Sequence, residues 1–386
     1  MNAIRHPRSH DAPRGAPSAA PAATLAIYAV FFLMGLWGCL SIYNSAPYAE
    51  NQIPFASKQL LWLALGLGVA IASAQVPFHW YERLTVPTAL AAYASLLLVL
   101  RFGVEQHGMR GWFHLKYCFA QPSELAKPIF ILALSVLAKR WNSPKNLFPV
   151  LAAFTLLWIL PLAAQPDFGT MTVYLCGFVL VYLLSNGSFA HLALAIPLMA
   201  IGMAAVYFKE PYVAERINAF FASSQHHMAG NWHSTQFARA LAGGGFSGSD
   251  WGRTVWSNNY LPLAHSDSSF AALVETVGFA GALPVIAGFC ALAYAGYRIS
   301  RGFEKQPRGV FIRAVSMLIA VQGLIHISVN VGLIPPTGIT LPMLSYGGSS
   351  MISTALCLGM VVSAARADSG SNSNHISETQ PAPGDP

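Results

Sequence analysis

The chain has 386 residues, of which 54% are hydrophobic and only 10% are charged, and its mean hydropathy is +0.48. This is more apolar surface than a soluble core can hide, so the composition excludes an ordinary soluble domain and indicates a polytopic membrane protein. The formal net charge of +7 does not indicate nucleic-acid binding, because the excess of Lys and Arg falls on one side of the predicted spans.

A membrane-spanning helix needs about 20 mostly apolar residues. Apolar runs near this length predict an all-α bundle of ten transmembrane helices. These runs cover residues 24–44, 58–76, 84–101, 123–138, 147–164, 168–185, 189–208, 268–297, 310–333 and 347–365.

Basic residues in the short connections set the expected orientation. If the N-terminus is cytoplasmic and the loops alternate, Arg83, Lys139, Arg140, Arg298 and Arg301 all face the cytoplasm. Both termini are then cytoplasmic. Residues 1–22 and 367–386 lack an apolar pattern and are expected to be disordered tails, with a single membrane domain at 23–366 between them.

Two short polar segments precede predicted spans on the outer side. The first, Gly108 to Lys127, contains Glu124 and Lys127, which are three residues apart and would share a helical face. They read either as a structural ion pair or as part of a polar cavity open to the outside. The second, QPDFGT at 165–170, carries Asp167, for which a turn aspartate is the simpler interpretation.

The longest connection, residues 209–267, is a large extracytoplasmic loop between predicted helices 7 and 8. Loops of this length in compact proteins are usually functional or disordered, and its many aromatic residues favour a loop lying along the lipid interface. It contains Arg216, Gln236, Arg239 and a glycine cluster at 243–248. Glycine-rich turns can cradle phosphate, but no Walker spacing is present, so this signal is weak.

The loop ends in His265, Ser266 and Asp267 at the start of a long apolar segment. Asp267 has two interpretations: it caps the next helix, or it is catalytic. Further on, Gln322, His326 and Asn330 are spaced four apart, which is typical of a polar stripe that joins helices.

The ordered motifs resemble the SEDS family of shape, elongation, division and sporulation proteins, which includes FtsW, RodA and SpoVE. They are GMRGW followed by QPSELAK, then QPDFGT, EPYVAERINAF, YLPLAHSD and LIPPTGITLPMLSYGGSS. The resemblance covers nearly all of residues 24–366, and LPLAHSD with GITLPMLSYGGSS is more similar to FtsW than to RodA. It implies a ten-helix peptidoglycan glycosyltransferase that polymerises lipid II on the periplasmic face of the bacterial cytoplasmic membrane during division.

The same resemblance implies the partners. They are lipid II, which is an undecaprenyl-diphosphate-linked disaccharide pentapeptide, a class B penicillin-binding protein, other divisome proteins and the lipid bilayer.

By the resemblance, Asp267 matches the family's essential aspartate, and Glu124, Lys127 and Asp167 match polar residues of its central cavity. The candidate substrate-binding residues are Arg110, Glu124, Lys127, Asp167, Arg216, Gln236, His265 and Ser266. No ligand cluster demands a metal ion, so no metal site is predicted. A divalent cation such as Mg²⁺ or Mn²⁺ could still neutralise the leaving diphosphate.

The chain departs from the family pattern at several positions. Ser268 and Ser269 stand where apolar residues are usual, and both are expected to expose Asp267 to water. Gly111 and His326 stand where Arg and Asn are common.

Forming a β-1,4 bond from an α-linked diphosphate inverts the anomeric carbon, so one displacement assisted by one base suffices. Asp267 is the predicted base, and Arg110, Lys127, Arg216 and Arg239 are the cations available for the leaving group. Two alternatives remain: a transporter of lipid II or another solute, and a scaffold without catalytic activity.

Overall fold

The computed structural model describes residues 20–45, 52–106, 108–116, 118–141, 143, 145–193, 207–208, 214, 217–218, 220–221, 232–249, 254–304 and 306–366. Its longer helices are α1 (Ala20–Ser45), α2 (Gln52–Gln75), α4 (Thr85–Phe102), α5 (Pro122–Arg140), α6 (Leu147–Ala164), α7 (Phe168–Leu184), α10 (Trp232–Gly244), α12 (Ser269–Ser300), α13 (Pro307–Asn330) and α14 (Gly348–Ala365). The shorter helices are α3 (Phe78–Arg83) and α11 (Trp256–Asn259). The strands are β1 (Val104–Gln106), β2 (Met109–Leu115) and β3 (Cys118–Ala120).

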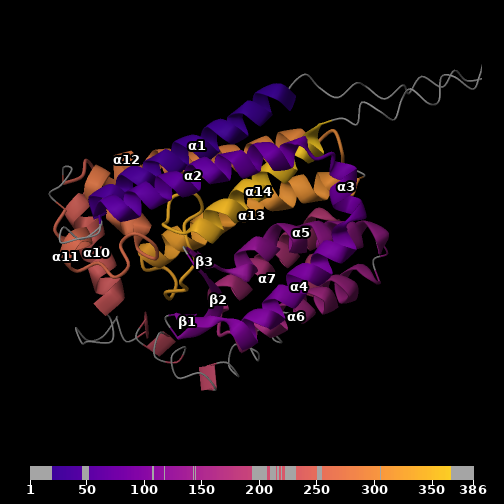
Figure 1. Cartoon of the computed structure of the whole chain (residues 1–386), viewed down its shortest axis with the longest axis horizontal. Coiled ribbons are helices and arrows are strands. Elements are labelled where there is room, and N and C mark those ends of the chain that lie inside the picture. The colour runs from indigo at the N-terminus through magenta and orange to yellow at the C-terminus, as the bar shows by residue number, and fades with distance from the viewer. Residues whose placement is uncertain are drawn as a thin grey trace, which may run out of the picture.

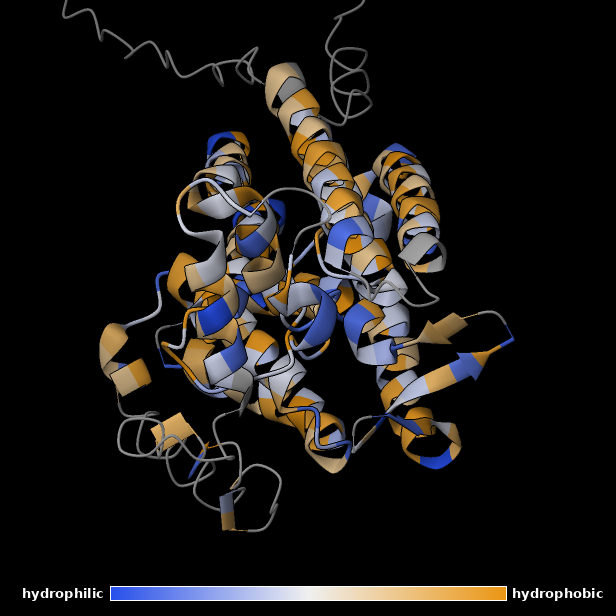
Figure 2. Ribbon diagram, turned by 90° about the vertical axis from the view of Figure 1, so that its left-hand side faces the viewer, coloured by the Kyte–Doolittle hydropathy of each residue, from blue (hydrophilic) through white to orange (hydrophobic). Residues whose placement is uncertain are grey.

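The prediction of a helical membrane bundle is confirmed. Seven of the described helices, α1, α2, α4, α6, α12, α13 and α14, are long and apolar enough to cross a membrane. Hydrophobic colours run along the helices in Figure 2, and large apolar side chains such as Leu33, Leu90 and Leu156 are exposed on them. These surfaces suit contact with lipid.

Nine of the ten predicted spans coincide with described helices, and α6 begins and ends at the residues predicted for it. Of the nine, α5 carries four charged residues and α7 has only 17 residues, so neither belongs to the seven long apolar helices. The predicted span at 189–208 lies mostly outside the described residues, so the total of ten remains a prediction. Residues 1–19 and 367–386 of the predicted tails also lie outside them.

Helices α5, α13 and α14 form the middle of the bundle. Helix α5 packs against α4, α6, α7, α13 and α14. Helix α14 also packs against α2, and helix α12 packs against α13 and α1. The most apolar stretch of α14 is 78% buried, compared with 17% for α4 at the periphery. Polar side chains on α5 and α13 are therefore shielded from lipid.

A small antiparallel sheet in the order β1-β2-β3 lies at the end of α4, between α4 and α5 (Figure 1). The sequence did not predict this sheet, because its strands are short. Its pairs, such as Leu115 with Cys118, lie within one hairpin.

Helix α12 is interrupted at Gly278, where φ is 71° and ψ is 176°. The loop after α10 fills this break: Phe279 N donates to Gly245 O at 3.0 Å, and Ala280 N donates to Phe246 O at 3.1 Å. A Cβ on Gly248 would lie 2.3 Å from Thr276 O, so the loop fits only with a glycine there. Since this part of the glycine cluster packs against the broken helix, the structure gives it a structural role rather than that of a phosphate cradle.

Candidate active site

Asp267 lies directly before α12, one residue ahead of its N-cap position. The helix begins at Ser269 with Ser268 in the N-cap position, and the Ser268 side chain makes no cap bond. The cap comes from α13 instead, because Asn330 Oδ1 accepts from Ala271 N at 3.0 Å. The N-cap position expected for Asp267 is therefore occupied by Ser268.

Hydrogen bonds fix the backbone around Asp267. Asn330 Nδ2 donates to Asp267 O at 3.1 Å, and Ser345 Oγ donates to Ser266 O at 2.8 Å. Tyr346 N donates to His265 O at 2.7 Å. Three consecutive carbonyls of the loop are thus held by α13 and by the connection between α13 and α14, which is residues 331–347. A carboxylate on such a backbone is preorganised.

The carboxyl group of Asp267 faces this connection. Gly338 has a φ of 70°, and a Cβ built on it would lie 3.9 Å from Asp267 Oδ2. Asp267 itself is neither buried nor fully exposed. Glycine at 338 therefore permits the turn and keeps one side of the carboxylate clear of a side chain.

The ring of His265 stacks on Phe55 of α2, with ring centroids 4.8 Å apart. Tyr346 meets it edge-on at 5.7 Å. Nearby, Gln59 Nε2 donates to Ser345 O at 3.1 Å, so α2 also supports the connection. His265 is consequently fixed in a small aromatic cluster and is not simply solvated.

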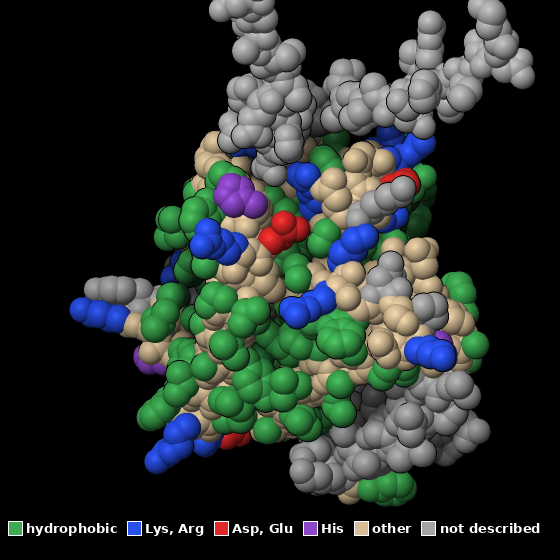
Figure 3. All heavy atoms as spheres, turned by 90° about the vertical axis from the view of Figure 1, so that its right-hand side faces the viewer, with side chains coloured by type: hydrophobic (Ala, Val, Ile, Leu, Met, Phe, Trp, Pro, Cys, Tyr) green, Lys and Arg blue, Asp and Glu red, His purple; other side chains and the backbone are tan. Residues whose placement is uncertain are grey.

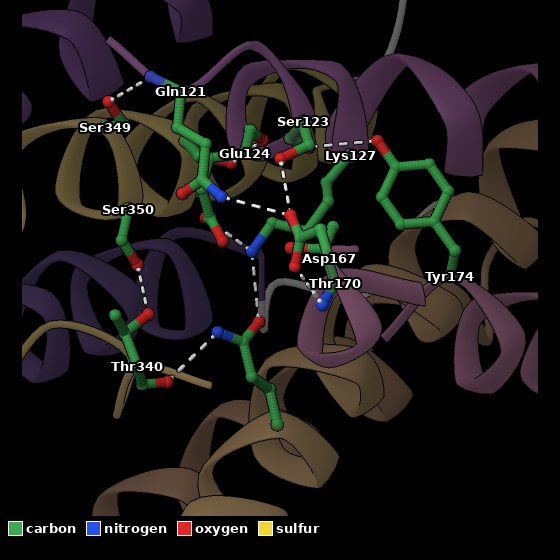
Figure 4. Close-up of polar contacts among 12 residues, drawn as sticks. Gln121, Ser123, Glu124, Lys127, Asp167, Thr170, Tyr174, Thr340, Ser349 and Ser350 are labelled. Carbon is green, nitrogen blue, oxygen red and sulfur yellow. Dashed lines mark hydrogen bonds and ion pairs between the residues drawn. The ribbon is translucent and has the colours of Figure 1, made fainter. Parts of the chain in front are cut away.

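A second group of polar residues lies at the start of α5 (Figure 4). Glu124 and Lys127 are both buried, and Glu124 Oε2 lies 2.6 Å from Lys127 Nζ, which confirms that they share a helical face. Lys127 Nζ also donates to Gln322 Oε1 of α13 at 3.2 Å. The pair is thus an internal ion pair whose cation is held by two acceptors.

Asp167 joins this group by capping α7. Its Oδ1 accepts from Thr170 N at 3.0 Å, and its Oδ2 accepts from Gln121 Nε2 at 3.1 Å and Ser123 Oγ at 3.3 Å (Figure 4). Asp167 lies between the spans α6 and α7, where burial raises the pKa of its carboxyl, the hydrogen bonds from Thr170 lower it, and the negative charge of Glu124 adds to the rise. In this structure Asp167 ties the starts of α5 and α7 together, as expected of a turn aspartate.

The polar stripe on α13 connects the two groups. Gln322 binds Lys127 at one end, and Asn330 binds the Asp267 carbonyl at the other. Eight residues of helix separate them, which corresponds to about 12 Å along the axis. The prediction that this stripe joins helices is confirmed. The four-residue spacing of Gln322, His326 and Asn330 could also have identified Asn330 as a residue that contacts the segment around Asp267.

The remaining predicted site residues are more scattered. Arg110 is exposed on β2, and Gln236 is buried on α10 with no hydrogen-bond partner for its Oε1 among the described residues. Arg239 lies over the ring of Trp256 at 5.3 Å. Arg216 lies outside the described residues. The structure thus brings together Glu124, Lys127 and Asp167 in one group, and His265, Ser266 and Asp267 in the other.

The family model of the FtsW, RodA and SpoVE cell cycle proteins matches residues 21–370. The chain belongs to this family. The probable peptidoglycan glycosyltransferase FtsW of Nitrosomonas europaea is 30% identical over 372 residues, which cover 92% of this chain and 95% of that protein. The protein of the same name from Nitrosococcus halophilus is 32% identical over 344 residues, covering 86% and 88%.

Solved structures show the same fold. A chain of a peptidoglycan synthase complex, described as coordinating polymerization and crosslinking, superposes with a TM-score of 0.72 at 24% identity, covering 90% of this chain and 97% of that one. The rod shape determining protein RodA of Thermus thermophilus gives 0.63 at 22% identity, covering 91% and 97%. The resemblance to the SEDS family is thereby confirmed for the whole membrane domain.

Ser268 and Ser269 are both buried, contrary to what their polarity predicts. Ser268 and Ser269 are 0% and 4% exposed. Ser268 Oγ donates to Pro262 O, while Ser269 Oγ lies 2.6 Å from Ser345 Oγ. The expectation that they expose Asp267 to water is wrong, because both hydroxyls are used inside the protein.

In the described part of the chain, no group of three or more His, Cys, Asp or Glu side chains is arranged so that it could hold a metal ion. The bond partners of Glu124, Asp167 and the nearby glutamines are side chains and backbone of the protein itself.

Proposed function

We propose that the chain is a peptidoglycan glycosyltransferase that polymerises lipid II on the periplasmic face of the cytoplasmic membrane, in division. Relatives about 30% identical over most of its length are named probable peptidoglycan glycosyltransferase FtsW, and the solved chain with the same fold comes from a peptidoglycan synthase complex. The observation that carries the proposal is the preorganised Asp267. It is partly exposed, and the carbonyls around it are held from two other elements.

In the proposed reaction, the 4-hydroxyl oxygen of the acceptor sugar attacks the anomeric carbon of the donor. The new C–O bond forms as the bond to the diphosphate breaks, and the diphosphate leaves with the electron pair. Asp267 takes the proton of the hydroxyl. General-base assistance of this kind contributes about 10² to 10⁴ in rate.

The charge of the leaving diphosphate must be balanced by cations. Lys127 is already paired with Glu124, so its positive charge is largely compensated before substrate binds. Arg110 on β2 and Arg239 on α10 form no ion pair with the described residues, and Figure 1 shows β2 and α10 away from α3, toward the end where α11 lies. In this proposal Arg110 and Arg239 neutralise the charge of the leaving diphosphate, together with Arg216 of the large loop and with a divalent cation where one is bound.

A class B penicillin-binding protein is the proposed partner, and other divisome proteins would recruit the pair to the septum. A transporter for lipid II and a non-catalytic scaffold are the competing functions. A carrier needs charges near the middle of the membrane on broken helices. Glu124, Lys127, Asp167 and Asp267 instead lie at the starts of α5, α7 and α12, toward one end of the bundle, which favours chemistry at the surface.

The deciding experiment measures polymerisation of purified lipid II by the full chain, with and without its transpeptidase partner. Asp267→Asn keeps the shape of the side chain but removes the base, so turnover should fall by about 10² or more. The matched control is Glu105→Gln, which removes an exposed carboxylate from strand β1.

Glu105→Gln should polymerise like the wild type. If Asp267→Asn also does so, Asp267 is not the base. If no form makes glycan even with the partner, a transport or scaffold role replaces the proposal, and flipping of labelled lipid II in vesicles separates those two.

A further inference from the structure

A buried polar link joins α12, α13 and the connection 331–347 directly behind Asp267. Ser269 Oγ lies 3.2 Å from His326 Nε2 and 2.6 Å from Ser345 Oγ. The three side chains are 4%, 1% and 4% exposed, so water does not compete for these bonds. Ser269 and His326 come from different helices, α12 and α13.

The chemistry of the neighbours fixes the direction of these bonds. His326 Nδ1 lies 2.7 Å from the carbonyl oxygen of Ile339, which can only accept, so Nδ1 carries the hydrogen. In a neutral imidazole Nε2 is then an acceptor. Because the single hydrogen of Ser345 goes to Ser266 O, the single hydrogen of Ser269 Oγ is shared between His326 Nε2 and Ser345 Oγ in a three-centre bond. His326 thereby connects Ser269 of α12 to the backbone of the connection.

Ser345 extends the link to the residue before Asp267. Its Oγ accepts from Leu341 N at 2.8 Å and donates to Ser266 O at 2.8 Å. Residues 266 and 269 are therefore fastened to the same buried group, with Asp267 between them. Leaving one of these buried groups without a partner destabilises the loop, which can then shift.

We propose that Ser269 and His326 are positioning residues for Asp267, holding its carboxylate at the place where the acceptor hydroxyl reacts. This rests on the proposed function, in which Asp267 is the base. A misplacement of about 1 Å at a reacting group can reduce the rate on the order of 10²-fold. We expect the link to act on turnover and not on substrate binding, because its side chains are buried.

The test uses the full chain in nanodiscs, with its transpeptidase partner present for the polymerisation assay. Ser269→Ala removes the shared hydroxyl, and His326→Phe keeps a ring of similar size without its nitrogens. Ser135→Ala is the control: Ser135 is 0% exposed, and its hydroxyl bonds only within α5, to Ile131 O at 2.8 Å. Two readouts are compared, lipid II polymerisation kinetics and amide hydrogen exchange of residues 263–270.

In Ser269→Ala and His326→Phe we expect exchange of residues 263–270 to rise and kcat to fall about 10- to 100-fold, with KM within about twofold of wild type. The double variant should lose no more than the worse single one, because both remove the same link. Ser135→Ala should resemble wild type in both readouts.

Unchanged exchange in Ser269→Ala and His326→Phe would overturn the link itself. Faster exchange with wild-type kcat would overturn its role in positioning Asp267. The proposed function has its own test: it is wrong if Asp267→Asn polymerises as fast as the wild type. The hydrogen-exchange result does not depend on that outcome. Ser269→Thr retains the hydroxyl and should restore most of the lost turnover; recovery no better than Ser269→Ala would count against the hydrogen bond.

Discussion

At the scale of single residues, Gly338 controls how closely the backbone approaches the proposed base. Its φ of 70° strains any other residue, and an added Cβ would touch Asp267 Oδ2 at 3.9 Å. We therefore predict that Gly338→Ala lowers stability by about 1–2 kcal/mol through the strained backbone. It should also lower the polymerisation rate about tenfold by covering one side of the carboxylate.

Gly332→Ala is the control for Gly338→Ala. Gly332 has a similar φ of 76° in the same connection, but a Cβ there meets nothing within 4 Å. Both variants should therefore melt at similarly reduced temperatures, and only Gly338→Ala should lose turnover. Equal turnover of the two would show that the space beside Asp267 does not matter for the reaction.

At the scale of the elements, α12 depends on α13 for its first turn. Asn330 caps α12 through Ala271 N and holds the Asp267 carbonyl. Asn330→Ala should therefore cost about 1 kcal/mol or more of stability and increase hydrogen exchange at residues 269–272.

The comparison for Asn330→Ala is Gln322→Ala, on the same face of α13. Gln322 bonds to Lys127 and to Thr340 O, and not to the start of α12. Exchange at residues 269–272 should stay at the wild-type level in Gln322→Ala. If both variants accelerate it equally, the effect comes from loosening α13 and not from loss of the cap.

At the scale of the whole molecule, charge distinguishes the two ends of the bundle. Figure 3 shows Lys and Arg side chains spread over the face on which α3 lies. Exposed basic residues of the described connections at this end include Arg83, Lys139, Arg140, Arg298 and Arg301. Since basic residues of short connections tend to face the cytoplasm in membrane proteins, we expect the opposite end, with the sheet and Asp267, to face the periplasm.

This orientation predicts the labelling of single cysteines. In a variant without the five native cysteines, Arg110→Cys on the sheet should react with a membrane-impermeant maleimide in spheroplasts. Arg301→Cys should react only after the membrane is opened. Labelling in the reverse order would invert the topology and place Asp267 on the cytoplasmic side, where the proposed reaction does not occur.

The sequence by itself determined the class of protein, the bounds of most helices and the family. A spanning helix satisfies its own backbone and must be apolar along its length, so residues 147–164 or 268–297 can be recognised without knowing their neighbours. The Glu124–Lys127 pair was predictable for the same reason, since its spacing lies within one helix.

Tertiary structure decided how the residues around Asp267 are used. The cap of α12 comes from Asn330, and the hydroxyl of Ser269 turns inward to His326 and Ser345. Glycines after α10 fill the break at Gly278 instead of forming a ligand site. Each of these contacts joins segments distant in the chain, and a buried polar group takes whichever partner the packing brings to it, which local sequence does not reveal.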